Sequence, residues 1–355
     1  MMCLKRPLLL LAAIFSVMFL SACERPPMDT VQHGFRGTGM DQVYNPRYLA
    51  TQVEKNAVPP SIGLIPADGP KAGAVYKNVK VLNNLSVGQF GTFMVSMTNW
   101  VAPKEGCAYC HNVANFAEES KYTKVVARNM ILMTQRVNSQ WKDHVVQTGV
   151  TCYTCHRGNN IPQNVWFKDP AEKMGNGMLG NKNGQNSPVE GSGYSSLPKN
   201  TYAAYLLGDE KIRVNGDTAL PTGNKSSINA TESTYGLMMH FSKSLGVNCT
   251  YCHNTRAVAS WEESPPQRTR AWYAIRMARD INNNYMVPLT GVFPEHRLGP
   301  TGDVAKANCA TCHQGAYKPL YGVSMIQDYP YLLGPSVYPV KAEDPPKAKQ
   351  VVSMK

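Results

Sequence analysis

The chain lacks an apolar run long enough to cross a membrane. Its run from Leu8 to Leu20 has 13 residues, whereas a transmembrane helix needs about 20. Histidine and cysteine are also scarce outside one repeated pattern. The residues left outside that pattern are Cys3, Cys23, His33, His144, His240 and His296. Further ligands for metal chemistry therefore have to come from a small set of side chains.

The short apolar run has the features of a secretory signal. Lys5 and Arg6 precede it, and small residues follow it before Cys23. The segment Leu-Ser-Ala-Cys that ends at Cys23 resembles a bacterial lipobox, whose cysteine is acylated and becomes the mature N-terminus. We therefore expect a lipoprotein-type signal peptide at residues 1–22 and lipidation of Cys23. The mature chain would then be lipid-anchored at the periplasmic face of the inner membrane. Plain cleavage nearby and an uncleaved anchor helix are the alternatives.

The repeated pattern is Cys-x-x-Cys-His, which occurs four times and is typical of c-type haem attachment. Two thiols bind one porphyrin covalently, and the histidine that follows ligates its iron. A redox dithiol or half of a zinc site would not need a histidine after every second cysteine. The pattern predicts four covalent haem c groups. Their cysteines and proximal histidines are Cys107, Cys110 and His111; Cys152, Cys155 and His156; Cys249, Cys252 and His253; and Cys309, Cys312 and His313.

The formal net charge of +12 would suggest a nucleic-acid partner, but it omits the negative charges of the haem propionates. Loss of Lys5 and Arg6 with the signal would leave +10. Eight propionates on four haems would reduce the total to about +2. We therefore expect no nucleic-acid partner.

The motifs alternate in type, and this alternation predicts a duplicated two-haem unit. Cys-His-Asn ends the first and third motifs, whereas glycine lies two residues after the histidine of the second and fourth. With 28 glycines and 25 prolines, the chain fits a mainly α fold with extensive loops, wrapped around haems in two pseudo-two-fold-related units. The expected divisions after the signal are an extended segment at 23–75, two-haem units at 76–160 and 231–320, a connector at 161–230 and a tail at 321–355.

The sixth iron ligands distinguish an electron carrier from a haem enzyme, because an enzyme leaves one axial position open. Met94 and Met238 lie on expected helices at similar distances before the first and third motifs, although core packing is the usual role of methionine. For the second motif we favour Met130 over Met133, because Met133 recurs in the second half as Met277.

The fourth motif lacks such a methionine, because Ala274 occupies the position equivalent to Met130. A different donor is therefore needed. His144 and His296 are nearly equal candidates on spacing alone, and either histidine can simply be a surface residue.

Longer stretches resemble the tetrahaem cytochrome subunit of purple-bacterial photosynthetic reaction centres. Beside the lipobox, these stretches are Gly34 to Gly37, Val75 to Val81, Val125 to Arg128, His144 with Gln147 to Cys152, and Pro266 to Tyr285. The resemblance covers nearly the whole mature chain. It implies methionine as the sixth ligand of the first three haems, through Met94, Met130 and Met238. It also implies ligation of the fourth haem by His313 and His144.

The resemblance also implies the function, which is electron transfer without substrate chemistry of its own. Electrons would pass from a soluble cytochrome c or high-potential iron-sulfur protein, through four haems, to the special-pair bacteriochlorophylls held by the reaction-centre L and M subunits. The first haem would face the donor and the third the special pair. A periplasmic multihaem reductase and a free tetrahaem shuttle are the rival hypotheses. The reductase would need an open iron and nearby acid–base residues.

Overall fold

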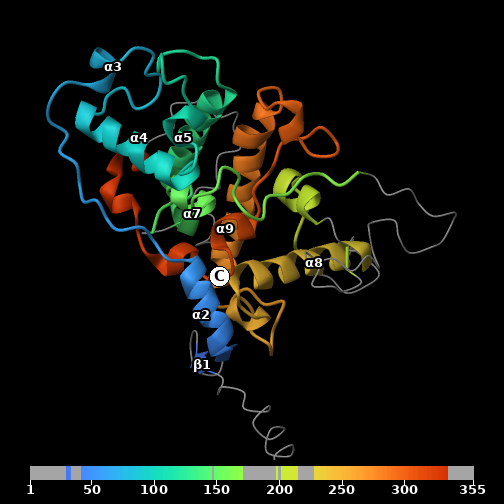
Figure 1. Cartoon of the computed structure of the whole chain (residues 1–355). Coiled ribbons are helices and arrows are strands. Elements are labelled where there is room, and N and C mark those ends of the chain that lie inside the picture. Colours follow the sequence, from blue (N-terminus) through green and yellow to red (C-terminus); the bar gives the residue numbers. More distant parts are fainter. Residues whose placement is uncertain are drawn as a thin grey trace, which may run out of the picture.

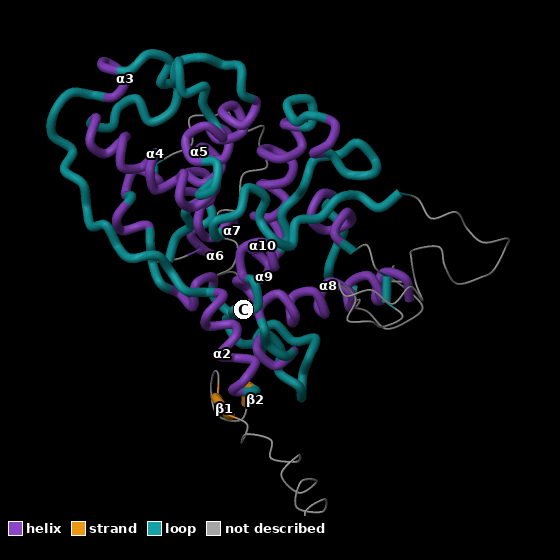
Figure 2. The backbone as a smooth tube through the Cα atoms, in the orientation of Figure 1, coloured by secondary structure: helices purple, strands orange, loops and turns teal. Residues whose placement is uncertain are grey.

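The computed structural model describes residues 29–32, 41–145, 148–170, 197–198, 201–214 and 228–334. Within these ranges the chain is largely helical, and long loops connect the helices (Figures 1 and 2). The strands of this part of the chain are β1 (Asp29–Gln32) and β2 (Asp41–Tyr44), which pair antiparallel. The expected mainly α architecture with extensive loops is confirmed.

The first half contains the helices expected around its two motifs. α4 (Val87–Val101) begins with a capping box, in which the side chains of Ser86 and Gln89 each accept a hydrogen bond from the other's backbone N–H. The short helix η1 (Gly106–Tyr109) follows, then α5 (Tyr122–Gln140), α6 (Lys142–Val145) and α7 (Cys152–His156). Met94 and Met130 thus lie on helices, as predicted.

The second half presents a similar order of elements. α8 (Ile228–Leu245) leads to η4 (Cys249–Tyr251), and α9 (Gln267–Asp280) continues into η5 (Ile281–Met286). The short helices η6 (Val287–Leu289) and η7 (Glu295–Arg297) precede α10 (Cys309–His313). In Figure 1, α4, α5 and α7 lie on one side of the molecule and α8 on the other, with α9 between them.

In each half, the helix that precedes the first of its two motifs makes the same backbone contact with the second motif. α4 packs against α7, and α8 packs against α10. The Gly158 N–H donates to the carbonyl of Trp100 at 2.8 Å, and the Gly315 N–H donates to the carbonyl of Ser244 at 2.8 Å. Both glycines have positive φ, of 81° and 83°, a conformation in which a side chain would be strained.

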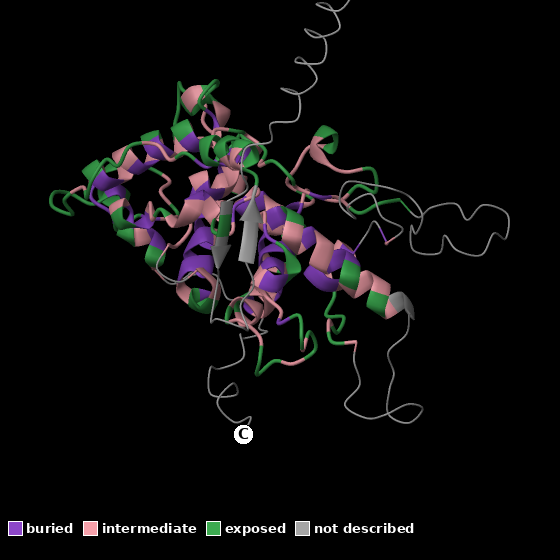
Figure 3. Cartoon of the chain, turned by 90° about the horizontal axis from the view of Figure 1, so that it is seen from below, coloured by how far each residue is buried: buried purple, intermediate pink, exposed green. Residues whose placement is uncertain are grey.

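In the described part of the chain, two hydrophobic clusters form the core, and each includes residues from a segment outside its two-motif half. The first joins Phe93 and Trp100 of α4 to Leu332, which lies near the end of the described chain. The second joins Leu237 of α8 to Leu206, which lies between the halves in sequence. Figure 3 shows the buried residues on the helix faces that meet inside the molecule.

The structure adds local elements to three of the expected divisions, whose bounds stay a prediction. The segment at 23–75, expected to be extended, contains α2 (Pro46–Lys55) and α3 (Ala72–Val75) as well as the hairpin. The described part of the 161–230 connector contains the short helix η3 (Ala203–Leu207), whose Leu206 is fully buried. The described tail forms η8 (Pro319–Gly322), η9 (Ile326–Asp328) and η10 (Pro330–Leu333). The connector and the tail each supply buried apolar residues to one of the two core clusters.

A buried ion pair joins the two halves. Arg136 on α5 lies 3.1 Å from the carboxylate of Asp280 at the end of α9, and both side chains are less than a tenth exposed. The indole N–H of Trp141 donates to the same carboxylate at 2.7 Å. Among the described residues, no helix is long and apolar enough to cross a membrane.

Candidate functional site

The second and fourth motifs form short helices with matching ends. α7 begins with a reciprocal pair between Thr151 and Thr154, and α10 begins with one between Asn308 and Thr311. These caps hold the backbone N–H groups that a helix end leaves unpaired. The first and third motifs instead form the 3₁₀ turns η1 and η4. The two motif types distinguished in the sequence therefore differ in backbone conformation.

A buried asparagine from the preceding helix fixes the chain just before each helical motif. The side chain of Asn138 on α5 accepts from the Val150 N–H at 2.8 Å and donates to the Val150 carbonyl at 2.9 Å. Asn282, after α9, makes the same two bonds with Ala307, at 2.8 and 2.9 Å. Val150 and Ala307 each lie two residues before a motif cysteine. The two asparagines occupy equivalent positions, each five residues after Met133 or Met277.

All four proximal histidines are oriented by the same type of contact. Nδ1 of His111 lies 3.3 Å from the Phe116 carbonyl, and Nδ1 of His253 lies 3.0 Å from the Val258 carbonyl. In the second and fourth motifs, the partners of His156 and His313 are the carbonyls of Asn159 and Ala316, at 2.8 and 2.9 Å. A carbonyl oxygen only accepts, so Nδ1 carries the proton and Nε2 keeps its lone pair. Metal-ligating histidines usually have this arrangement.

Burial keeps these imidazoles neutral. It lowers the pKa of His313 to about 4 and also lowers the pKa values of His111, His156 and His253. A neutral imidazole is the form that ligates iron. None of the eight motif cysteines is joined in a disulfide, so all are available for attachment to porphyrin vinyl groups. The donor set therefore fits haem c at each motif.

His144 reaches across from the first half to the fourth motif. Helix α6 packs against α9, and Nδ1 of His144 donates to the Arg270 carbonyl at 3.2 Å. Its ring centroid lies 6.0 Å from that of His313, with an interplanar angle of 56°. Metal–nitrogen bonds of about 2 Å would place two imidazoles on opposite sides of one iron with centroids about 6 Å apart.

Burial, with a smaller contribution from the neighbouring His313, lowers the pKa of His144 to about 4. His296, the alternative that spacing left open, is exposed on η7. The structure thus brings together the two histidines named for the fourth haem.

A cavity of about 780 Å³ spans the first and second motifs. Its lining includes Cys107 and His111 of the first motif and Cys155 and His156 of the second. Six methionines also line it, namely Met94, Met97, Met130, Met133, Met277 and Met286. The cavity therefore gathers both methionines named for these haems, together with the neighbour of each. A shared space also places the two sites next to each other.

The second and fourth motifs are in direct contact. The side chains of Cys155 and Cys312 are neighbours, because Cys312 raises the pKa of Cys155 and Cys155 lowers the pKa of Cys312. Arg157 donates to the Cys312 carbonyl at 3.3 Å, and Gln314 donates to the Cys155 carbonyl at 3.2 Å. The cysteines of these two motifs are therefore adjacent.

The remaining candidates lie farther from these contacts. Met238 is on α8, packed against the second core cluster that contains Leu237. Helix α8 ends four residues before Cys249 of the third motif. Cys23 and the signal segment lie outside the described residues.

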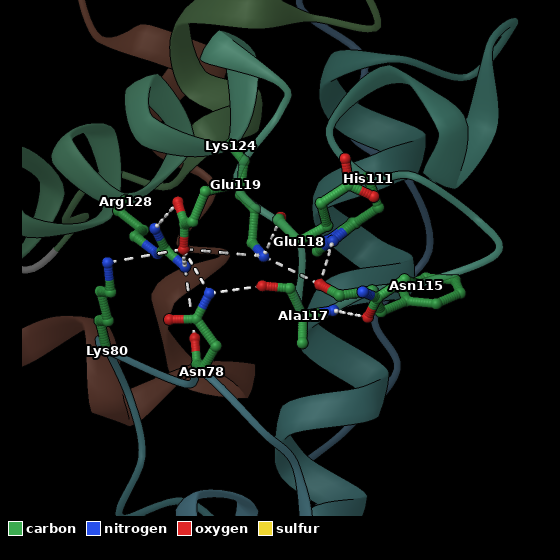
Figure 4. Close-up of polar contacts among 10 residues, drawn as sticks. Asn78, Lys80, His111, Asn115, Ala117, Glu118, Glu119, Lys124 and Arg128 are labelled. Carbon is green, nitrogen blue, oxygen red and sulfur yellow. Dashed lines mark hydrogen bonds and ion pairs between the residues drawn. The ribbon is translucent and has the colours of Figure 1, made fainter.

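A polar cluster, not expected from the sequence, surrounds the first motif (Figure 4). Glu119 accepts two hydrogen bonds of 2.7 Å from Arg128, which lower its pKa to about 2. Lys80 lies 3.5 Å from the same carboxylate. Lys124 is buried and donates to the carbonyls of Phe116 and Glu118, each at 2.8 Å. These contacts hold the loop that carries the carbonyl partner of His111.

Residues 24–333 match the family model described as the photosynthetic reaction centre cytochrome C subunit. The chain belongs to this family. It is 55% identical over 324 residues to the photosynthetic reaction center cytochrome c subunit of Rubrivivax gelatinosus, covering 91% of this chain and 88% of the relative. It is 49% identical to the subunit of the same name from Thermochromatium tepidum, covering 90% and 78%. With that of Roseobacter denitrificans it shares 39% identity, covering 85% of each chain.

Membership settles the general role. A photosynthetic reaction centre cytochrome c subunit carries electrons in photosynthesis, holds covalent haem c with its iron, and associates with the reaction centre at a membrane. The resemblance inferred from the sequence is therefore confirmed. The motif geometry described above shows how this member of the family accommodates haem.

Proposed function

We propose that the chain holds four haem c groups in two two-haem units and conducts electrons from a soluble periplasmic donor to the photo-oxidised special pair. Haem supplies the one-electron chemistry of its iron, and the protein supplies position, ligands and electrostatics. The observation that carries the proposal is the repeated histidine arrangement. At each of four motifs, a carbonyl binds Nδ1 and leaves Nε2 for the metal.

The proposed axial ligands leave no iron open to a substrate. His144 and His313 are proposed for the fourth haem, on the strength of their 6.0 Å centroid separation. Met94 and Met130 are proposed for the first and second haems, because both line the cavity shared by these motifs. Met238 is proposed for the third from its place on the helix that leads to that motif. Filled axial positions suit electron transfer and not catalysis on a bound substrate.

The contacts between motifs support a linear order of haems. The first and second share a cavity, the second and fourth touch through Cys155 and Cys312, and helix α8 of the third packs against α10 of the fourth. The proposed order is therefore first, second, fourth, third. The first haem would receive electrons from a soluble cytochrome c or a high-potential iron-sulfur protein. The third would face the special-pair bacteriochlorophylls of the L and M subunits.

Attachment to the membrane is proposed to use lipidated Cys23 on the periplasmic side. Intact-mass measurement of the mature protein should give an N-terminal cysteine carrying acyl chains and four haem additions. An unmodified N-terminus, or fewer than four haems, would contradict this part of the proposal.

Flash photolysis of membranes that contain the chain tests the whole proposal. After the bacteriochlorophyll special pair is bleached, a haem absorbance change should follow within microseconds. Carbon monoxide should not bind the reduced native protein, because every iron has two protein ligands. Rapid stoichiometric binding of carbon monoxide, or bleaching without haem oxidation, would reject the proposal.

A further inference from the structure

In the loop that follows the first motif, one carbonyl oxygen accepts hydrogen bonds from two side chains. The Phe116 carbonyl accepts from Nδ1 of His111 at 3.3 Å and from Nζ of Lys124 at 2.8 Å. Lys124 lies on α5, and its side chain is 8% exposed. It also donates to the Glu118 carbonyl at 2.8 Å and lies 3.9 Å from the Glu119 carboxylate. The two carbonyls engage two of the three N–H donors of the ammonium group, and the Glu119 carboxylate is an ion-pair partner.

The third motif repeats this arrangement with a different cation. The Val258 carbonyl accepts from Nδ1 of His253 at 3.0 Å and from Nη1 of Arg268 at 3.2 Å. Arg268 holds the position on α9 that corresponds to Lys124 on α5, when Met133 is aligned with Met277. The histidine contacts at these two motifs, 3.3 and 3.0 Å, are longer than the 2.8 and 2.9 Å found at the second and fourth.

We propose that Lys124 is a positioning and potential-setting residue for the first haem, acting on His111 through the Phe116 carbonyl. The inference rests on the proposed haem at the first motif. Two effects act in the same direction. A cation on the carbonyl weakens it as an acceptor, so His111 becomes a poorer electron donor to iron. The positive charge also disfavours the ferric state, which carries one more positive charge than the ferrous state. Both effects raise the reduction potential of the first haem.

Redox titration of the haem-loaded protein tests this role. Lys124→Met should reduce the equilibrium constant for reduction of the first haem about tenfold, a fall of 59 mV for one electron. The other three steps should stay in place. Lys124→Arg keeps a cation that can reach the carbonyl and should stay within about threefold of the wild type. The titration step of the first haem is identified as the one whose midpoint potential changes in Met94→His.

Lys80→Met is the matched control. Lys80 interacts with Glu119 at 3.5 Å, but its side chain is 60% exposed, and the donors to the Phe116 carbonyl are His111 and Lys124. This variant should leave the first step within about threefold of the wild type. A fall equal to that of Lys124→Met would mean that general surface charge sets the potential, which would overturn the inference.

A measurement on the unmodified protein covers the case in which the Lys124 variants do not fold. In the fully reduced, diamagnetic protein labelled with ¹⁵N-histidine, the Nδ1–H proton of His111 should resonate upfield of that of His156, because its hydrogen bond is weaker. The opposite order would overturn the inference. If four haems titrate and Lys124→Met leaves the reduction potential of the first haem unchanged, only the role of Lys124 is rejected. A wild-type protein without haem at the first motif would reject the proposed function itself.

Discussion

Two imidazoles from different halves of the chain meet at the fourth motif. Their ring centroids are 6.0 Å apart, and burial lowers the pKa of each to about 4. We expect His144→Met to raise the reduction potential of the fourth haem, because a thioether ligand favours the ferrous state more than an imidazole ligand does. The reduction equilibrium should change at least about tenfold, or 59 mV. Redox titration with spectra of each step measures this change.

His296→Met is the control for that experiment. His296 is exposed on η7, so its replacement should leave all four steps in place. A shift confined to the second haem in His144→Met would contradict the pairing of His144 with His313. Unchanged potentials in both variants would also contradict it.

Glu119 gives the first motif a pH-dependent contribution to stability. The bidentate contact with Arg128 lowers its pKa from 4.5 to about 2. A carboxylate with a lowered pKa in the folded state stabilises the fold at pH values above its unfolded pKa, and this contribution is lost as the pH falls toward the folded pKa. The side chain is 39% exposed, so solvent screening limits the effect to about 0.5–1 kcal/mol.

Glu119→Gln should therefore lower the free energy of unfolding at pH 7 by that small amount. The difference from the wild type should decrease between pH 4.5 and about 2, as Glu119 becomes protonated. Denaturant titrations at several pH values measure it. A difference that persists unchanged at the acidic end would show that the charge of Glu119 is not responsible.

At the scale of elements, buried asparagines connect the long helices to the helical motifs. Asn138 is 2% exposed and makes two bonds to Val150 and one to the Leu332 carbonyl at 3.0 Å. Asn138→Ala would leave these buried backbone groups unpaired, at about 1–3 kcal/mol for each unsatisfied group. We expect a loss of about 3 kcal/mol in the free energy of unfolding, measured by denaturant titration.

Asn283→Ala provides the comparison. Its side chain donates a single exposed bond to the Leu207 carbonyl at 2.9 Å, so the loss should be about 0.5 kcal/mol. Asn282→Ala should resemble Asn138→Ala, because it makes equivalent bonds to Ala307 and to the Leu206 carbonyl. Equal losses in Asn283→Ala and Asn138→Ala would argue against the proposed connection.

The sequence could predict the elements that carry haem chemistry, but not what covers them. Motif spacing is set by the porphyrin, and the helices around Met94 and Met130 follow from local pattern. Spacing alone left His144 and His296 open, and only the resemblance favoured His144. The structure explains its approach to His313, because α6 packs against α9. Likewise, Leu206 and Leu332 occupy loop-rich segments, and only long-range packing shows that each is fully buried. From the sequence alone, Lys124 would be taken for an exposed lysine on a helix. The structure shows that it is buried and bonded to two carbonyls.

At the scale of the whole molecule, the contacts between motifs form a chain from the first to the third. The second and fourth motifs are its middle, where Arg157 and Gln314 each bond a cysteine carbonyl of the other motif. A buried ion pair between Arg136 and Asp280 also joins the two halves. A buried pair of this type costs about 3–5 kcal/mol when one partner is removed, so it keeps the halves in a fixed relation.

Interruption at the second motif should therefore separate two reactions that flash photolysis resolves. In Cys152→Ala with Cys155→Ala, oxidation of the third haem after the flash should keep its rate. Its re-reduction by the soluble donor should slow about tenfold or more, which corresponds to 1.36 kcal/mol in activation free energy. If this variant does not accumulate, Met130→His keeps the tether and lowers the potential of the second haem, with the same expected separation. Met97→Leu changes another methionine of the cavity and should leave both rates in place. Undiminished re-reduction in the interrupted protein would mean that electrons reach the third haem without passing the second, and that the linear order is wrong.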